Sequence, residues 1–192
     1  KQIIMYQTLG WNLPKFAHLP MILGADKKRL SKRHGAVGVQ AFRDQGYLPE
    51  AIINYLALLG WNPGTDEEVF TREQLVEIFS LDQVNKKGAV FDYKKLNWIS
   101  GQHLMIKSNE DILDTFREMN PEWGKTESDV YVLRVIEQLK VRSKSLIQLT
   151  EQSRYFFKDP ESYDENAKKK SWKEDTRELL DSYFTDISKL GD

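Results

Sequence analysis

Strand-type patterns stop after about residue 105, and this change is the strongest constraint on the fold. Before it, short apolar runs at residues 19–24, 68–70 and 89–91 predict short strands, the first of them buried. Beyond it, the chain carries only helix signals. The sequence therefore predicts a mainly α fold, in which a small α+β module over residues 36–104 precedes an all-helical module over residues 105–192.

Glycine and proline set the predicted helix limits in the first module. A helix over residues 39–45 is expected to end at Gly46, because a glycine readily adopts the left-handed conformation that terminates helices. Pro49 suits the first turn of a second helix, whose apolar residues recur at helical spacing from residue 50 to 59. Gly60 is predicted to end that helix in the same left-handed way.

Side chains that can cap helix N-termini predict where further helices begin. The predicted capping residues, some paired with a residue three positions later, are Thr71 with Gln74, Asp92, Ser108 with Asp111, Thr126 with Asp129, and Ser171 with Glu174. One long helix is expected to take its apolar surface from Tyr131, Leu133, Val135, Ile136 and Leu139. The helix expected after Ser171 contains Leu179, Leu180, Tyr183, Phe184 and Ile187. The basic run at residues 168–170 is interpreted as a solvated face.

Composition excludes several classes of protein. The chain has 192 residues, 40% of them hydrophobic and 30% charged, which is ordinary for a globular protein. It has no cysteine, which rules out disulfides and thiolate zinc sites and fits a reducing compartment. We expect no membrane span, no signal peptide and no metal site, since the three histidines lack metal-ligand spacing. The first six residues read as the middle of an element, so we expect a piece of a longer protein.

Positive charge is concentrated at one place. Residues 1–35 have a net charge of +6, whereas the rest of the chain has −7. Five cations lie within the seven residues from Lys27 to Arg33. Like charges this close repel one another, so a multivalent anion such as a triphosphate or a nucleic-acid backbone would stabilise the loop. A solvated basic loop is the alternative interpretation.

The residues of this loop suggest a family. Residues 29–33 (Arg-Leu-Ser-Lys-Arg) resemble the KMSKS signature of class I aminoacyl-tRNA synthetases in its K-L-S-K-R form. Arg29 departs from that form by replacing the first lysine, which keeps the charge and alters the donor geometry. Matching stretches surround the signature at residues 18–22, 46–51, 54–61 and 90–101. Together they make nearly the whole chain similar to bacterial-type glutamyl-tRNA synthetases, from the end of a Rossmann-type catalytic domain (residues 1–35) onwards.

The resemblance implies roles in ATP binding. Lys32 would be the catalytic residue that contacts the phosphates as pyrophosphate leaves, and Ser31 would help to hold the loop. The remaining residues implied to bind ATP are Met21, Ile22, Arg29, Leu30 and Arg33. For Met21 and Ile22 the backbone would meet the adenine edge, although simple strand packing is an alternative. Mg²⁺ would accompany ATP.

The resemblance also implies contacts with tRNA for glutamate. Residues 36–104 would form the stem-contact domain, with Lys95 and Asn85 near the tRNA backbone. Residues 105–192 would form an incomplete anticodon-binding domain, in which Arg142 reads an exposed base edge; an ordinary cation near a helix C-terminus is the alternative. The implied parent is a cytoplasmic, monomeric glutamate–tRNA ligase that binds ATP, glutamate and tRNA. Its HIGH motif is not in these residues, so we expect the chain alone not to catalyse glutamylation.

Three rival interpretations stand beside this one. A glutaminyl-tRNA synthetase would continue into β-barrels, which the helical pattern after residue 105 disfavours. A truncated paralogue that modifies tRNA for aspartate would lack a helical anticodon region. A non-catalytic helical module with a basic docking loop is the rival from another class of protein.

Overall fold

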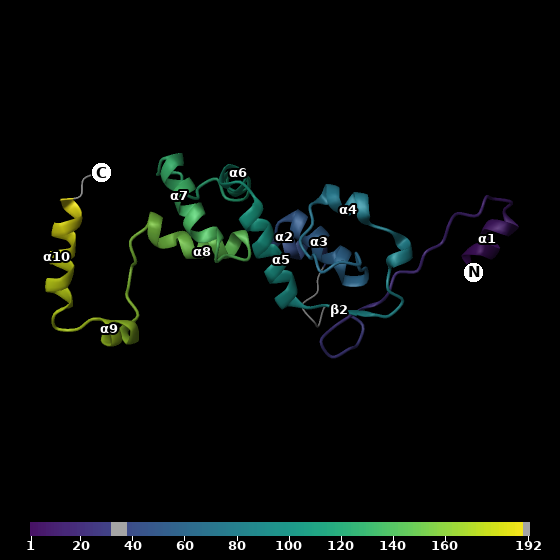
Figure 1. Cartoon of the computed structure of the whole chain (residues 1–192), viewed down its shortest axis with the longest axis horizontal. Coiled ribbons are helices and arrows are strands. Elements are labelled where there is room, and N and C mark those ends of the chain that lie inside the picture. The colour runs from purple at the N-terminus through teal and green to yellow at the C-terminus, as the bar shows by residue number, and fades with distance from the viewer. Residues whose placement is uncertain (32–37, 190–192) are drawn as a thin grey trace. The chain divides into compact units, whose positions relative to one another are not determined.

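The computed structural model describes residues 1–31 and 38–189, and it is mainly helical, as predicted (Figure 1). In chain order the elements are α1 (Gln2–Thr8), β1 (Ile22–Leu23), α2 (Val39–Asp44), α3 (Pro49–Gly60), α4 (Arg72–Ile78), the 3-10 turn η2 (Leu81–Gln83), β2 (Ala89–Val90), α5 (Tyr93–Ile106), α6 (Asn109–Met119), α7 (Asp129–Lys140), α8 (Leu146–Phe157), α9 (Glu165–Ser171) and α10 (Thr176–Ser188). They divide into two compact units, residues 1–154 and 155–192. The predicted boundary after residue 104 falls inside α5 and stays a prediction.

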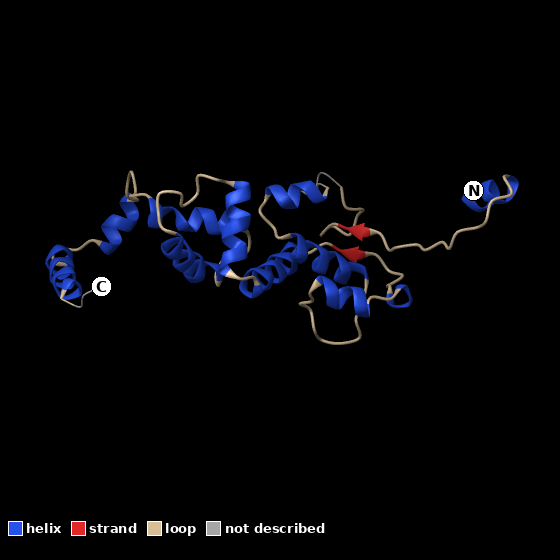
Figure 2. Cartoon of the chain, turned by 90° about the horizontal axis from the view of Figure 1, so that it is seen from above, coloured by secondary structure: helices blue, strands red, loops and turns tan. Residues whose placement is uncertain are grey.

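The strands β1 and β2 form a small parallel pair, which Figure 2 shows in red. Ile22 pairs with Ala89 and Leu23 with Val90. The prediction of a buried strand over residues 19–24 is wrong in its extent and its burial. Only two residues are paired, and Leu19 and Met21 are 71% and 56% exposed. Periodicity could not show this, because an apolar run reads alike whether or not both of its faces are covered.

The end of α2 is built as predicted. Gly46 has a φ of +75°, its N–H donates to the Arg43 carbonyl at 2.8 Å, and the Tyr47 N–H donates to the Phe42 carbonyl at 3.0 Å. These two bonds form a Schellman motif, which satisfies carbonyls that the helix leaves open. Pro49 then occupies the first turn of α3.

The prediction for Gly60 is wrong. Gly60 is the last helical residue of α3, and it is not among the described glycines that have positive φ. Its lack of a side chain serves packing instead, because a Cβ there would lie 3.0 Å from the Pro20 Cγ. A glycine at a helix end therefore had a long-range reason that local sequence does not reveal.

An aromatic core joins the strand pair to the helices α2, α3 and α5. Its buried members are Phe42, Ile52, Tyr55, Phe91, Leu96 and Ile99. Phe91, which directly follows β2, stacks on Phe42 with ring centroids 5.8 Å apart and meets Tyr55 edge-on at 5.0 Å. Such contacts add to the area that the rings bury and orient α2 against the strands.

Residues 68–70 do not form the predicted strand. The buried Asn54 takes the place of a partner strand: its amide donates to the Glu68 carbonyl at 3.2 Å, and its Oδ1 accepts the Phe70 N–H at 2.9 Å. One side chain thus satisfies two backbone groups of this segment, the Glu68 carbonyl and the Phe70 N–H. The following helix α4 begins with the predicted capping box of Thr71 and Gln74.

Helices α6, α7 and α8 form the predicted all-helical part of the first unit. Ser108 caps α6 as predicted, with its hydroxyl accepting the Asp111 N–H at 3.0 Å. The predicted start of α7 at Thr126 is wrong by two residues, because Ser128 is the cap and accepts the Tyr131 N–H. Buried apolar residues of these helices include Ile112, Phe116, Val135, Ile136, Leu139 and Leu149.

The second unit, residues 155–192, contains α9 and α10. The predicted cap at Ser171 is wrong, since Ser171 ends α9 and α10 follows Asp175. The lysines at residues 168–170 are exposed, as predicted. The apolar residues of α10 are exposed as well, among them Leu179 (62%) and Phe184 (65%). Within residues 1–31 and 38–189, no helix is long and apolar enough to cross a membrane.

Candidate functional site

The first half of the cationic loop leaves β1 as a tight hairpin. The Gly24 N–H donates to the Lys28 carbonyl at 2.8 Å, and the Leu30 N–H donates to the Ile22 carbonyl at 2.9 Å. Lys27 sits at the tip with a φ of +60°, and the Asp26 carboxylate accepts the Lys28 N–H at 3.0 Å. The backbone at the base of the loop is therefore held by four of its own contacts, including the Lys27 N–H bond to the Gly24 carbonyl at 2.9 Å.

The side chains of this hairpin divide into exposed cations and one apolar anchor. Lys27, Lys28 and Arg29 are exposed, whereas Leu30 is half-buried and packs against the aromatic core. Of the cations predicted to bind ATP, Arg29 is the one that the structure describes, and it is exposed beside the anchored Leu30. Ser31 is exposed, and Lys32 and Arg33 lie outside the described residues.

The backbone of Met21 and Ile22, which is predicted to meet adenine, already takes part in the strand pair. The Met21 carbonyl accepts the Ala89 N–H at 3.1 Å, and the Ile22 carbonyl accepts the Leu30 N–H. A carbonyl oxygen has two lone pairs, so each has capacity for a second bond. Of the two side chains, only that of Ile22 packs against the core; Met21 is exposed.

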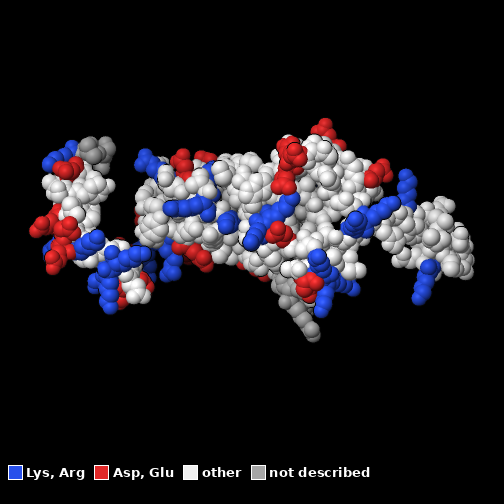
Figure 3. Space-filling model, turned by 60° about the horizontal axis from the view of Figure 1, so that its bottom comes forward, with Lys and Arg blue, Asp and Glu red and all other residues white. Residues whose placement is uncertain are grey.

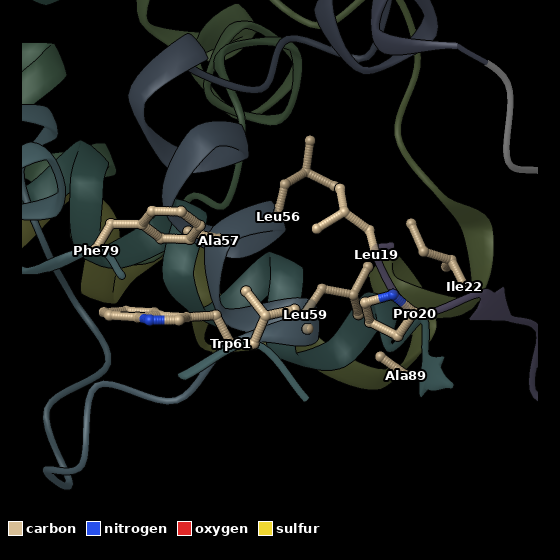
Figure 4. A pocket seen from close by; sticks show the side chains of 11 residues that line it. Leu19, Pro20, Ile22, Leu56, Ala57, Leu59, Trp61, Phe79 and Ala89 are labelled. Carbon is tan, nitrogen blue, oxygen red and sulfur yellow. The ribbon is translucent and has the colours of Figure 1, made fainter. Parts of the chain in front are cut away.

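An apolar pocket of about 300 Å³ lies beside β1, and sequence reasoning missed it. Figure 4 shows Trp61 and Phe79 on one side of it and Leu19, Pro20 and Ile22 on the other. The described residues that line it include none with a charge, so its chemistry does not suit phosphate. The Trp61 Nε1 is buried and has no hydrogen-bond partner among residues 1–31 and 38–189, although indole N–H groups usually find one. Periodicity gave no signal for this pocket, because its walls come from five separate segments.

The predicted tRNA contacts Lys95 and Asn85 lie on the α+β module of residues 36–104, called the mixed module below. Lys95 is in the first turn of α5, where Asp92 caps the helix, and it forms an ion pair with Glu68. Asn85 is exposed, and its N–H donates to the Gly60 carbonyl at 2.8 Å. A phosphate that met Lys95 would therefore compete with a carboxylate.

Arg142 lies on the turn between α7 and α8, far in sequence from the other predicted contacts. It is exposed, and its N–H donates to the Leu139 carbonyl at 3.2 Å. Within the part of the chain that the structure describes, Arg142 lies beside the start of α8 and outside the segment of residues 21–31, and its role in reading a base stays a prediction.

Electrostatics inside the mixed module favour neutral side chains. Burial raises the pKa of Tyr55 to about 12, and its hydroxyl accepts the Asp92 N–H at 2.7 Å. Burial lowers the pKa of His103, an effect that the Glu50 carboxylate partly offsets. On the surface, Lys and Arg are interleaved with Asp and Glu over the face drawn in Figure 3. Among the described residues, no group of three or more His, Asp or Glu could hold a metal ion.

Comparison with known families identifies the two halves of the chain. Residues 1–98 match the family described as "tRNA synthetases class I (E and Q), catalytic domain", and residues 110–192 match "Anticodon binding domain". The chain belongs to the class I tRNA synthetases of the glutamate and glutamine group. The resemblance to glutamyl-tRNA synthetases that the sequence suggested is confirmed.

Individual synthetases of this family are similar along almost the whole chain. The glutamate–tRNA ligase of Chloroherpeton thalassium is 41% identical over 196 residues, which include 95% of this chain and 39% of that protein. The ligase of Prosthecochloris aestuarii is 37% identical, with 100% and 41% covered.

Solved synthetase structures agree. The crystal structure of a glutamate tRNA ligase from Elizabethkingia meningosepticum in complex with its amino acid matches with a TM-score of 0.81 and 34% identity, over 97% of this chain and 41% of that one. The synthetase from Elizabethkingia anophelis matches with a TM-score of 0.72 and 35% identity, over 88% and 38%. The chain thus spans about two fifths of the length of these relatives.

Proposed function

We propose that the chain supplies the ATP-phosphate loop and the tRNA contacts of a glutamate–tRNA ligase, which activates glutamate with ATP and transfers it to tRNA for glutamate. The observation that carries the proposal is the anchored hairpin of residues 22–30, which presents exposed cations at the place of the family's signature loop. Its relatives are named glutamate–tRNA ligases. The proposed enzyme is a cytoplasmic monomer.

In the proposed activation step, Lys32 binds the phosphates of ATP. Negative charge grows on the departing pyrophosphate, and a fixed ammonium group lowers the energy of that charge more in the transition state than in the ground state. Arg29, Ser31 and Arg33 complete the loop, while Leu30 anchors it. The backbone of residues 21–22 offers the adenine edge a strand to bind against. Mg²⁺ enters bound to the phosphates of ATP.

The proposed tRNA surface uses two modules in addition to the end of a Rossmann-type catalytic domain at residues 1–35. Residues 36–104 act as the stem-contact domain, where Lys95 and Asn85 meet the RNA backbone. Residues 105–192 act as the anticodon-binding domain, where Arg142 hydrogen-bonds to a base edge in a bidentate manner. Single-stranded anticodon bases expose such edges. The all-helical part of the described chain after residue 105 favours this assignment over a β-barrel one.

Substitution of the signature lysine tests the proposal. In the complete ligase, Lys32→Ala should lower the rate of glutamyl-adenylate formation about 100-fold or more, since one preorganised charge contact contributes roughly that much to catalysis. Binding of tRNA should change by less than about threefold, because one phosphate contact among many carries little affinity. Lys169→Ala, at an exposed lysine of α9, is the matched control. Unchanged adenylate formation in Lys32→Ala would refute the catalytic role.

A further inference from the structure

Gly46, at the end of α2, makes a backbone contact with the start of α8, a hundred residues later in the chain. The Gly46 carbonyl accepts the Leu146 N–H at 2.8 Å. Leu146 is the first residue of α8, and the first N–H groups of a helix have no partner within the helix. The carbonyl that follows α2 thus caps α8, and both Gly46 and Leu146 lie within the unit of residues 1–154.

This contact leaves no room for a side chain at position 46. A Cβ there would lie 2.6 Å from the Ile147 nitrogen and 3.0 Å from the Ile147 Cγ1. The first of these neighbours is backbone, so the start of α8 would have to move to accommodate it. Gly46 is therefore required twice, for its φ of +75° and for the close approach.

The opposite side of the same turn is fixed by α5. The Ser100 hydroxyl, which is fully buried, donates to the Lys144 carbonyl at 2.6 Å. A Cβ on Gly101 would lie in ordinary van der Waals contact with the Ser143 carbonyl oxygen, 3.5 Å away, so α5 packs against this turn. Ser143 is itself 2% exposed, and its hydroxyl donates to the Leu139 carbonyl at 2.8 Å.

The segment that Gly46 and Ser100 hold in place contains Arg142. The two residues after Arg142 are both bonded, the Ser143 N–H to the Leu139 carbonyl at 3.1 Å and the Lys144 N–H to the Gln148 Oε1 at 2.8 Å. A bidentate contact with a base edge tolerates little rotation of the guanidinium plane. The orientation of this turn should therefore decide how well Arg142 discriminates between bases.

We propose that Gly46 is a positioning residue for anticodon discrimination: with Ser100 it holds the turn of residues 141–147 on the mixed module, and thereby sets the direction of Arg142. The inference rests on the proposed function of Arg142. It adds a residue that touches no RNA itself, and it couples α2, the first described element after the ATP loop, to the place where the anticodon is read.

The test compares charging of two tRNAs by the complete ligase. One is tRNA for glutamate, and the other carries a changed third anticodon base; the readout is the ratio of their kcat/KM values. Gly46→Ala is compared with Gly64→Ala, where φ is also positive (+80°) but a Cβ would meet nothing within 4 Å. Strain is thus matched between the two variants and only the contact differs. Ser100→Ala, which adds no volume, probes the other side of the turn if Gly46→Ala does not fold.

We expect Arg142→Ala and Gly46→Ala each to lower the ratio about fivefold or more, Ser100→Ala to lower it less, and Gly64→Ala to leave it unchanged. In the Arg142→Ala background, Gly46→Ala should produce no further loss of the ratio. If Gly46→Ala, or Ser100→Ala in its place, slows both tRNAs equally while Arg142→Ala lowers the ratio, the inference fails alone. If Arg142→Ala leaves the ratio unchanged, the proposed role of Arg142 fails, and the inference is overturned with it.

Discussion

Replacement of Asn54 by alanine should destabilise the mixed module more than any single exposed substitution. Asn54 is fully buried, and its amide joins three partners: the Glu68 carbonyl, the Phe70 N–H and the His103 Nε2 at 2.9 Å. The bond from the Phe70 N–H identifies the shared atom as the amide oxygen of Asn54, which can only accept. The His103 Nε2 must therefore carry the proton that it donates to this oxygen. One side chain thus ties α3, the extended segment 68–70 and α5 together.

The expected loss follows from these three bonds. The Phe70 N–H would be left buried without a partner, at a cost of about 1–3 kcal/mol. The Glu68 carbonyl and the His103 ring would each lose a bond with a net value of about 1 kcal/mol. We therefore expect Asn54→Ala to reduce the free energy of unfolding by about 3–5 kcal/mol, which is a large share of the stability of a typical domain.

Urea unfolding followed by tryptophan fluorescence would measure this loss. The matched control is Asn62→Ala, since Asn62 is exposed and its side chain accepts the Gly64 N–H at 2.8 Å. That variant should lose less than about 1 kcal/mol, because water can replace its bond. If Asn54→Ala lost no more than Asn62→Ala, the argument that one amide replaces a partner strand would be wrong.

Three further predictions concern charge and packing. Burial lowers the pKa of His103 in the folded chain, so the neutral side chain contributes fully to stability above pH 6.5, the ordinary pKa of histidine, and this contribution is lost as the pH falls through the lowered pKa. The urea midpoints of the unmodified protein at pH 7.5 and 5.5 should therefore differ more than those of His103→Gln. Glu68→Gln should release Lys95 and strengthen tRNA binding at low salt, with a log–log salt slope steeper by up to about 1 in fluorescence anisotropy; an unchanged slope would exclude Lys95 as a phosphate contact. Trp123→Phe should keep the stack on Phe116 but lose the bond from the indole Nε1 to the Ser153 hydroxyl, lowering the free energy of unfolding by about 1–2 kcal/mol in urea titration; no change would show that this bond contributes nothing.

Local signals explain the parts of the fold that the sequence predicted well. Thr71, Asp92 and Ser108 cap helices as expected, because a cap needs only a side chain and the N–H groups two or three residues further on. The same is true of Gly46, whose Schellman motif closes within six residues. Such interactions are complete within one turn, so the sequence carries all the information needed to recognise them.

Two of the wrong predictions depended on partners far away in sequence. Residues 68–70 read as a strand, but their hydrogen bonds go to the side chain of Asn54. Gly60 looked like a helix stop, but it makes room for Pro20. At Thr126 and Ser171 the spacing of a capping pair was present, and the helix began elsewhere. Helix-capping propensity marks several possible helix starts, and the rest of the fold determines which of them is used.

The candidate site shows the same division. Its cations and its family signature could be recognised from consecutive residues, whereas the clamp between Gly46 and the 141–147 turn could not, because no local rule connects residues a hundred positions apart. The apolar pocket beside β1 was missed for the same reason. The Gly46 glycine was recognised for its conformation, and its second use became visible only in the structure.

The packing of Leu30 against the aromatic core explains how the neighbouring cations of the loop can be held close together. Two unit charges 4 Å apart repel by about 1 kcal/mol even in water, so neighbouring cations would separate if the backbone were free to move. Here the hairpin bonds fix the backbone beneath Lys28 and Arg29, and burial of a leucine side chain, which contributes about 1.5–3 kcal/mol when complete, opposes that separation. A merely solvated loop has no need of such an anchor. A phosphate-binding loop gains from this anchor, because the anchor holds the cations close together in the folded chain. Binding of an anion then lowers the energy of their mutual repulsion.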